Sequence, residues 1–574
     1  MSRVVIRREM NFAGAQFKDL HPLLQRLYQS RGIDSESQIS RELPDLVPYQ
    51  DLLNIQEAAA RIAHAVQTDR RILIVGDFDT DGATSTVLAI KALQAMGAHQ
   101  VDFLVPNRFV YGYGLSPGIV DLAYQEKKPD LIVTVDNGIS SLEGVTRARN
   151  LGIEVIVTDH HLPGERVPEG AVIVDPNQPG DRFASKCIAG VGVIFYVMLA
   201  VRARLEDQQW FTTHNIPRPN MGHYLDLVAL GTIADVVPLD KNNRILVHQG
   251  LRRIRSGSTH LGILALLHIA NRHPSRIQAV DLGFVLGPRL NAAGRLEDMS
   301  LGIHCLLAES PIQAKQLAER LDELNCERRA LEAQMQQEAF DIVQNLKIGK
   351  KLPLGLCIYD ETWHQGVVGL VASRIKEKFH RPVIAFALGD DGLLKGSARS
   401  IANLNIRDVL EKIAVRYPNL INKFGGHAMA AGLTLDPKDF GKFSEVFSET
   451  VTEEIGQNEL CHKLYTDGPL NEDEFTFEVA EILRFGGPWG PGFPEPLFDG
   501  EFKLINQRLV GRRHLKMVLQ APGNDQYLDA IAFNIDLNQW PNYDRATIRL
   551  AYRMDINEYR GRKKLQLVVE EILD

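Results

Sequence analysis

Gly76-Asp77-Phe78-Asp79-Thr80-Asp81-Gly82 follows the apolar run Arg71-Ile72-Leu73-Ile74-Val75, and this junction decides the fold class. A continuous apolar run of this length is typical of a strand buried on both faces of a parallel sheet. The aspartates therefore follow the carboxyl end of a strand, the edge at which open α/β sheets bind ligands. Alternation along the strand exit predicts that Asp77, Asp79 and Asp81 point to one side, where their charges repel unless cations lie between them.

Two plainer interpretations of this acidic stretch have to be weighed. Asp77, Asp79, Asp81 and Gly82 match positions 1, 3, 5 and 6 of a calcium-binding EF-hand loop, but position 12 is Leu88 and the loop follows a strand instead of a helix. The other interpretation is a solvated acidic turn. It would leave unexplained why similar side chains recur behind later apolar segments.

Those later segments carry chemically related side chains. The runs 130–135 and 153–157 have the composition of buried strands, and the segment 230–237 is apolar apart from one acidic residue. An unpaired buried carboxylate is costly, so a metal ion is a natural partner. The acidic and imidazole groups that follow these runs, or lie within them, are Asp136, Asp159, His160, His161 and Asp235.

This mixture of ligands indicates the metal and the chemistry. Carboxylates with imidazole suit Mn²⁺, and also Mg²⁺, whereas the sequence has no Cys-x-x-Cys pair for a structural zinc or iron–sulfur site. Five or six such ligands are enough for two ions. Two ions about 3.5–4 Å apart form the clamp that promotes in-line displacement at phosphorus, so the sequence predicts phosphoester hydrolysis.

The motif Asp79-x-Asp81, with Asp136 and the triplet Asp159-His160-His161, resembles the DHH phosphoesterase superfamily. Nearly the whole chain resembles the branch of that superfamily that degrades single-stranded DNA in the 5′→3′ direction, and the likeness is weakest before about residue 50. Further stretches that carry the resemblance are 105–108, 111–114, 287–295, 396–400 and 425–428.

The resemblance implies roles for individual residues. Asp136 is the expected bridge between two metal ions, and Asp136, His160 and His161 are the expected catalytic residues. Asp159, and also Asp77, could either ligate a metal or orient a ligand. The expected metal ligands are Asp77, Asp79, Asp81, Asp136, His160 and Asp235.

His161 is assigned to the scissile phosphate. Adjacent residues usually point apart, so His161 is not expected to bind the same ion in the same way as His160. An imidazole with a pKa near neutrality can donate a hydrogen bond or a proton to the leaving 3′ oxygen.

A second group of residues is expected to bind the 5′-terminal phosphate of the strand and so to set the 5′→3′ direction of digestion. Arginine suits this role because its planar fork pairs bidentately with phosphate oxygens. The glycine-rich stretch 425–432 is interpreted either as a tight turn into a helix or as a helix N-terminus that binds an anion. The expected phosphate-binding residues are Arg108, Arg289, Ser397, Arg399, Gly426 and His427.

Composition agrees with a soluble multidomain protein. The chain has 574 residues, 45% of them hydrophobic and 24% charged, with five scattered cysteines, no membrane-length apolar run and no signal-peptide pattern, so we expect a cytoplasmic location. The formal net charge of −8 is unusual for a nucleic-acid enzyme. Residues 502–564, however, contain twelve Lys and Arg against six Asp and Glu.

The predicted fold is a multidomain α/β protein. A lead-in over 1–50 precedes a doubly wound parallel-sheet DHH domain over 51–305, a connecting helix over 306–348 and a smaller α/β DHHA1 domain over 349–455. Several short strand patterns over 456–574 fit an OB-like barrel that binds nucleic acid.

The predicted function is exonucleolytic release of 5′ mononucleotides from single-stranded DNA, in DNA repair and recombination. The sequence lacks an NTP-binding Gly-x-x-x-x-Gly-Lys-[Ser/Thr] loop, so unwinding would require a helicase, and a single-strand-binding protein is a further expected partner of a monomeric enzyme. Two alternatives remain at this point. One is a phosphoesterase for short oligonucleotides or cyclic dinucleotides, and the other is a scaffold that binds single strands without cutting them.

Overall fold

The computed structural model describes residues 4–9, 17–18, 20–107, 110–347, 352–456, 463–511, 513–523, 525–537, 539–559 and 561–573. The chain forms two units. The first contains the residues up to Gly294, Asp298–Asp322 and the segment from Lys463 onward, and the second contains Arg295–Glu297 and the segment from Glu323 to His462.

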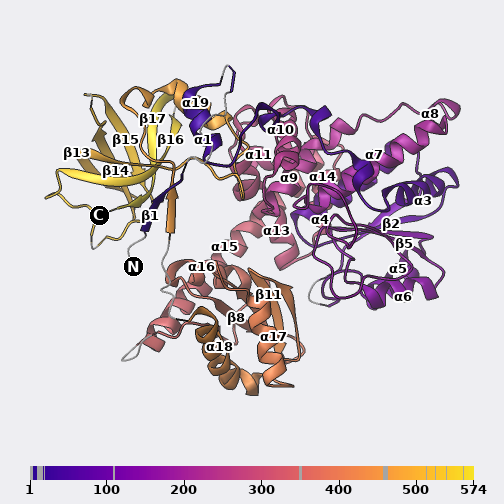
Figure 1. The fold of residues 1–574 in the computed structure, drawn as a ribbon. Coiled ribbons are helices and arrows are strands. Elements are labelled where there is room, and N and C mark those ends of the chain that lie inside the picture. The colour runs from indigo at the N-terminus through magenta and orange to yellow at the C-terminus, as the bar shows by residue number, and fades with distance from the viewer. Residues whose placement is uncertain are drawn as a thin grey trace. The chain divides into compact units, whose positions relative to one another are not determined.

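A parallel sheet with the strand order β3-β2-β4-β5-β6 lies in the first unit (Figure 1). Every residue of its two central strands, β2 and β4, is buried, as the apolar runs predict. The five strands are β2 (Ile72–Gly76), β3 (Val101–Leu104), β4 (Leu131–Val135), β5 (Glu154–Thr158) and β6 (Val172–Val174).

Helices cover both faces of this sheet, which confirms the doubly wound arrangement. Leu73 and Val75 of β2 pack with α5 (Pro117–Glu126) and α6 (Leu142–Asn150). Because side chains alternate along a strand, Ile72 and Ile74 face the other side. The helices α3 (Ile55–Gln67), α4 (Thr80–Ala95) and α7 (Gly190–Asp207) contact one another and the sheet there.

A helical segment follows the sheet. Its main helices are α8 (Trp210–Thr213), α9 (Leu225–Ala234), α10 (Lys241–Arg255), α11 (Leu261–Ile269), α12 (Ala279–Asp281), α13 (Gly287–Leu296) and α14 (Ser300–Leu307). A π-helical turn, Leu282–Leu286, joins α12 to α13. The connecting helix is present as the 37-residue α15 (Pro311–Lys347), with Pro311 at its start.

The C-terminal part of the first unit is a closed five-stranded barrel with the order β13-β14-β15-β17-β16. Its strands are β13 (Phe498–Val510), β14 (His514–Gln520), β15 (Tyr527–Ala532), β16 (Thr547–Tyr559) and β17 (Arg562–Ile572), and α19 (Phe477–Phe485) packs on β16. Phe498, Phe502 and Tyr552 fill its interior. The OB-like barrel is therefore confirmed, and Tyr552 belongs to its core.

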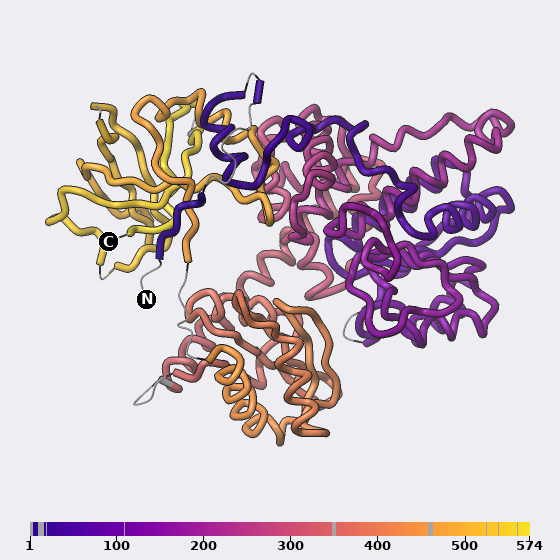
Figure 2. Tube along the Cα trace, viewed as in Figure 1, coloured from indigo at the N-terminus to yellow at the C-terminus, as the bar shows by residue number. Residues whose placement is uncertain are grey.

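The N-terminal segment belongs structurally with the far end of the chain. Strand β1 (Val4–Arg7) pairs in parallel with β12 (Lys463–Thr466), so the indigo start of the trace in Figure 2 runs beside an orange segment. The helices α1 (Pro22–Gln29) and α2 (Glu36–Ile39) follow. A buried ion pair joins Arg31 to Asp467 at 2.9 Å. The lead-in therefore stabilises the entry to the barrel.

The second unit contains a mixed sheet with the order β10-β11-β9-β8-β7. The end of α15 packs with α16 on one face, and α17 and α18 pack on the other face. These elements are β7 (Leu356–Tyr359), α16 (Val368–Phe379), β8 (Val383–Leu388), β9 (Leu394–Arg399), α17 (Ile406–Arg416), β10 (Lys423–His427), β11 (Ala430–Leu435) and α18 (Phe440–Ile455).

One local prediction is wrong. The glycine-rich stretch neither turns into a helix nor forms a helix N-terminus, because β10 and β11 pair as an antiparallel hairpin with Gly426 opposite Ala431. Glycine tolerates either backbone, and pairing of β11 with β9 decides in favour of strands.

Two further expectations concern the whole chain. The domain boundaries proposed from the sequence remain predictions. Among the described residues, no helix is both long enough and apolar enough to cross a membrane.

Candidate metal centre

The parallel sheet brings three strand ends together. Gly76 at the end of β2 pairs with Val135 at the end of β4, and Val135 in turn pairs with Thr158 at the end of β5. The backbone N–H of Asp136 also donates to the carbonyl of Thr158 at 3.0 Å. The polar groups that follow these strands are therefore neighbours, as predicted from the apolar runs.

Potential ligand atoms form three overlapping groups, in each of which all the atoms lie within 4.8 Å of one another. They are Asp77 with Asp79 and Asp136, Asp81 with His160 and Asp235, and Asp136 with His160 and His161. Asp136 belongs to two groups, and its Oδ1 lies 3.1 Å from Nε2 of His160. The same nitrogen lies 3.5 Å from Oδ2 of Asp235. Every predicted metal ligand is present in this cluster.

The aspartates of the first loop converge by a different route from the one predicted. The strand ends at Gly76, and Asp79 caps α4 by accepting the N–H of Gly82 at 3.0 Å. Asp81 already lies in the first turn of that helix. The positions of Asp79 and Asp81 are therefore set by the start of α4, and the alternation of side chains along a strand plays no part.

Two backbone amides fix the carboxylate of Asp81. The N–H groups of Gly190 and Val191, at the start of α7, donate to its two oxygens at 2.7 and 3.0 Å. A Cβ atom on Gly190 would lie 2.7 Å from the Cβ and Oδ1 of Asp136, so glycine leaves the room that Asp136 occupies. Gly231 is similarly placed, since its Cβ would lie 2.7 Å from Oδ1 of Asp81. Sequence reasoning did not identify either glycine.

The backbone at the centre of the cluster is strained. Asp136 has a φ of 62° and Val236, next to Asp235, has a φ of 64°. Non-glycine residues seldom adopt this left-handed conformation, and a β-branched residue does so least readily. Such strain concentrates at functional sites, where the surrounding structure holds it in place.

The cluster is electrostatically unfavourable without a cation. Burial raises the pKa of Asp136 well above its ordinary value, and the charges of Asp81 and Asp79 raise it further. Burial also raises the pKa of Asp81 to about 7, with the charge of Asp79 as the second cause. The pKa of Asp235 is raised well above its ordinary value for the same reasons. A divalent cation would favour the ionised form of all three carboxylates.

His160 is ready to act as a ligand. Burial, and then the charge of His161, lowers its pKa to about 4, so its imidazole is neutral near pH 7. Nε2 of His160 and Oδ1 of Asp136 are buried and lie 3.1 Å apart, but among the described residues they are hydrogen-bonded neither to each other nor to any other group. Unpartnered buried polar atoms are rare and call for an explanation. Mn²⁺ or Mg²⁺ fits this donor set.

Asp159 orients its neighbours. It is fully buried, and its carboxylate accepts from the N–H groups of Ile139 and His160 at 2.9 and 2.7 Å and from Nδ1 of His161 at 2.7 Å. Burial alone would raise its pKa, but the hydrogen bond and charge of His161 lower it. Its oxygens are thus committed to protein donors, which favours the orienting role that the sequence left open.

His161 lies on the accessible side of the cluster. Its side chain is 41% exposed. Burial would lower its pKa, but the hydrogen bond and charge of Asp159 raise it to about 10, so the imidazole is protonated near pH 7. The hydroxyl of Tyr113 lies 3.3 Å from Nδ1 of His161 and donates to the backbone carbonyl of Asp136 at 3.1 Å. His161 can therefore present a proton to an anion, and its assignment to the scissile phosphate stays a prediction.

The stretch 287–295 has a supporting function that the sequence did not reveal. The side-chain oxygen of Asn291 accepts from both the N–H and the hydroxyl of Thr80, at 2.7 and 2.8 Å. A Cβ on Gly294 would lie 2.0 Å from the carbonyl oxygen of Phe78. Residues 287–295 therefore hold the acidic loop 77–81 in place.

The predicted phosphate-binding residues are distributed over the two units. Arg108 lies outside the described residues. In the first unit, Arg289 is buried on α13, where Nε donates to Asp322 at 2.8 Å and Nη1 donates to the carbonyl of Val285 at 2.7 Å. Its guanidinium is therefore partly committed to protein partners.

In the second unit, Ser397 and Arg399 converge on the first turn of α16. Nη1 of Arg399 lies 3.0 Å from Oγ of Ser397, and a Cβ on Gly369 would lie 2.8 Å from both side chains. A helix N-terminus beside a guanidinium suits an anion. Gly426 and His427 lie on the exposed hairpin. The helix end that was predicted at the glycine-rich stretch is thus supplied by α16.

Comparison with known families gives three matches along the chain. The DHH family N-terminal domain matches residues 71–232, the DHHA1 domain matches 351–453, and the RecJ OB domain matches 466–571.

Full-length relatives agree. The chain is 52% identical over 567 residues to the single-stranded-DNA-specific exonuclease RecJ of Escherichia coli (strain K12), covering 99% of this chain and 98% of that protein. It is 33% identical to the Bacillus subtilis (strain 168) exonuclease of the same name, covering 96% of this chain and 68% of that protein. Among solved structures, RecJ of Thermus thermophilus in complex with Mn²⁺ matches with a TM-score of 0.79 and 29% identity, covering 96% of this chain and 76% of that one.

Proposed function

This chain belongs to the RecJ family of single-stranded-DNA-specific exonucleases, and from that premise we propose that it removes 5′ mononucleotides stepwise from the 5′ end of single-stranded DNA. The observation that carries the proposal is the cluster around Asp136, where carboxylates and imidazoles form three overlapping ligand groups, two of which contain Asp136. Two divalent cations held there, Mn²⁺ or Mg²⁺, would activate water and neutralise charge on the phosphate.

Side chains around the metal centre have distinct proposed roles in the reaction. Asp136, held in its strained conformation beside Gly190, is the shared ligand. His161, oriented by Asp159, donates to the phosphate or to the departing 3′ oxygen. Tyr113 restrains His161 from the open side. Because these groups are fixed before substrate binds, little reorganisation accompanies the reaction.

The 5′→3′ direction rests on the anion-binding arrangement in the second unit. A terminal phosphate carries close to two negative charges, more than an internucleotide phosphate. Arg399, Ser397 and the first turn of α16 would therefore favour a 5′-phosphorylated end. We propose this as the origin of polarity, with Gly426 and His427 as additional contacts.

The barrel is proposed to bind the strand on the 3′ side of the cut. Phe533 and Tyr527 of its surface are exposed, and Phe533 lies edge-on to His514 at 5.2 Å. Exposed aromatic groups, together with the basic residues Arg508 and Lys516 that pair across β13 and β14, offer stacking and backbone charge without sequence preference. In a cytoplasmic monomer of this kind, a helicase and a single-strand-binding protein would supply single strands.

Digestion of end-labelled DNA tests the proposal. A 5′-phosphorylated single strand labelled at its 3′ end should shorten progressively with Mn²⁺ and release 5′ mononucleotides, while the matching blunt duplex persists. Asp136→Ala should abolish cutting, whereas Asp130→Ala, at the opposite end of β4 and paired with Arg71, should not. Arg399→Ala should reduce the preference for a 5′ phosphate, with the exposed Arg416→Ala as its control.

Three other outcomes would reject parts of the proposal. Shortening from the 3′ end would reverse the direction. Cleavage restricted to very short oligomers would indicate a small-substrate phosphoesterase, and an uncut strand that nevertheless binds would indicate a scaffold.

A further inference from the structure

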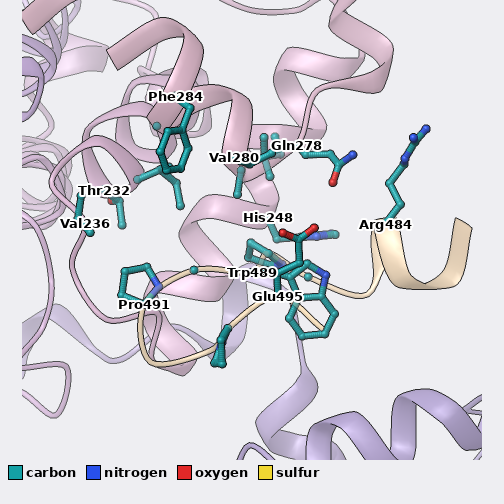
Figure 3. A pocket seen from close by; sticks show the side chains of 18 of the residues that line it. Thr232, Val236, His248, Gln278, Val280, Phe284, Arg484, Trp489, Pro491 and Glu495 are labelled. Carbon is teal, nitrogen blue, oxygen red and sulfur yellow. The ribbon is translucent and has the colours of Figure 1, made fainter. Parts of the chain in front are cut away.

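A cavity of about 520 Å³ lies within the first unit, walled by α9, α10, the π-helical turn and the loop 487–495 (Figure 3). Its volume is typical of sites that enclose a small ligand or one part of a larger one. Its lining includes the polar side chains Thr232, His248 and Gln278 and the aromatic side chains Phe284 and Trp489.

Two aromatic rings give the cavity flat walls. Phe284 projects from the π-helical turn and is 76% exposed, although a phenyl ring is normally buried. Such turns occur frequently at functional sites. Trp489 has a fixed orientation, because it stacks on Phe493 at 5.0 Å and its Nε1 donates to the carbonyl of Leu483 at 2.8 Å. A planar ligand would fit against either ring.

Neutral polar groups also face the cavity. Thr232 is fully buried, and within the described part of the chain its hydroxyl has no hydrogen-bond partner. A helical threonine usually bonds the carbonyl one turn earlier, so an unpartnered hydroxyl here is unusual. His248 lies near Arg41, and burial followed by that charge lowers its pKa to about 4, which leaves a neutral imidazole. With Gln278, these side chains offer both donors and acceptors.

One arginine gives the cavity an unpaired positive charge. Arg484 is paired with Asp555, and Arg553 with Glu495 and Glu570, whereas Arg255 has no carboxylate within ion-pair distance among the described residues. A purely aliphatic ligand would leave the neutral polar groups unsatisfied, which carries a cost. A planar, hydrogen-bonding group attached to a phosphate would satisfy the aromatic walls, the neutral polar groups and Arg255 together.

The cavity adjoins the metal centre through one helix. Thr232 and the ligand Asp235 lie at the end of α9, and the strained Val236 that follows Asp235 lines the cavity. Gly231, one residue before Thr232, is packed against Asp81. A strand whose phosphate lies at the carboxylates is therefore close enough to place a neighbouring base here.

We propose that this cavity receives one unstacked nucleobase of the single strand, held between Phe284 and Trp489 and bonded at its edge by Thr232, His248 and Gln278. The inference rests on the proposed function and adds a position at which the enzyme grips a base next to the cutting site. A duplex cannot supply such a base without unpairing, so the cavity also selects for single strands.

Binding without metal tests the inference separately from cutting. In EDTA, fluorescence anisotropy of a 5′-phosphorylated, 3′-labelled strand gives the affinity without digestion. Phe284→Ala should weaken binding by roughly 10- to 100-fold, the range expected for loss of one base–aromatic stack. Thr232→Val, which removes only the hydroxyl, should weaken it several-fold. Phe477→Ala removes another exposed phenyl ring of the first unit and should have no effect.

An abasic nucleotide moved stepwise from the 5′ end identifies the base. At one position the abasic strand should lose the same affinity as Phe284→Ala, and combining the two changes should cause no further loss, because both remove one contact. Equal thermal unfolding of the variants confirms that the fold is intact.

The outcomes that overturn the inference are distinct from failure of the proposed function. If the wild-type protein binds and digests single strands but no abasic position couples to Phe284, the cavity does not hold a base of the strand. If free mononucleotides quench Trp489 fluorescence and compete with the strand while no abasic position couples, the cavity is a product site. A wild-type protein that neither binds nor cuts single strands would instead reject the proposed function.

Discussion

Gly190 gives the sharpest test of how the metal centre is built. Its N–H donates to Asp81 at 2.7 Å, and its Cα faces Asp136, so one residue positions two expected ligands. Substitution by alanine adds a single methyl group at the start of α7. The backbone there is compatible with alanine, because Gly190 is not among the residues with a positive φ. Gly190→Ala should therefore act by crowding Asp136 and not by straining the backbone.

The size of the effect follows from the distances. The new methyl carbon would lie 2.7 Å from Oδ1 of Asp136, whereas ordinary contacts begin at 3.4 Å, so the carboxylate must move by about 0.7 Å. Overpacking of this kind costs about 1–3 kcal/mol of stability. Displacing a catalytic group by about 1 Å costs on the order of 100-fold in rate, and disturbing the support of a metal ligand costs about 10- to 100-fold in metal affinity.

Gly192→Ala is the matched control. It lies two residues along the same helix, and its methyl carbon would lie 2.4 Å from Cγ1 of Ile188, a buried apolar side chain that is not among the expected ligands. Isothermal titration with Mn²⁺, thermal unfolding and strand digestion are measured for both variants. Both should lose stability, but only Gly190→Ala should lose metal affinity and activity. Wild-type Mn²⁺ affinity and digestion in Gly190→Ala would refute the argument.

Three further predictions test other parts of the structure. Burial, and then the charge of Asp159, raises the pKa of Asp175 to about 8, so this carboxyl favours the folded state at low pH and that contribution falls by about 2 kcal/mol between pH 6.5 and 8. Urea unfolding in EDTA should show a fall that is larger by this amount in the wild-type protein than in Asp175→Asn, because Asp81, Asp136 and Asp235 also have raised pKa values and contribute to the fall in both proteins; identical pH profiles would contradict this. Asn291→Ala leaves the N–H of Thr80 without its acceptor, while the hydroxyl keeps the carbonyl of Gly287. It should lower the free energy of unfolding by about 1–3 kcal/mol and reduce digestion, and unchanged urea midpoints would contradict this support of the acidic loop. Arg31→Met leaves the buried Asp467 short of a partner and should destabilise the protein by up to about 3–5 kcal/mol in calorimetry, whereas a neutral effect would show that Arg8 compensates.

The sequence predicted the parts of the fold that depend on local pattern. The runs that became β2, β4 and β5 are continuous and apolar, so their burial and their polar ends could be read directly. The long helix α15 could be recognised by its length and by Pro311. The barrel strands alternate in the regular way. The glycine-rich hairpin was missed because glycine carries no preference, and the pairing partner β9 lies far away in the sequence.

The sequence predicted the side chains that gather at the candidate metal centre but not the residues that support them. Asp235 could be identified because it interrupts an apolar segment, even though that segment is a helix. Gly190 and Asn291 could not, because each acts on a loop more than a hundred residues away and neither carries a charge. The cavity beside Phe284 was equally hidden. A π-helical turn has no clear sequence pattern. A phenylalanine is expected in the core from sequence alone, so the exposure of Phe284 could not be predicted.

Anomalous diffraction at the manganese absorption edge, from crystals grown with Mn²⁺, tests the central claim most directly. The structure predicts two peaks about 3.5–4 Å apart, one bound by Asp77 and Asp79 and the other by Asp81, His160 and Asp235, with Asp136 contacting both. A single peak, or two peaks of which only one contacts Asp136, would contradict the account.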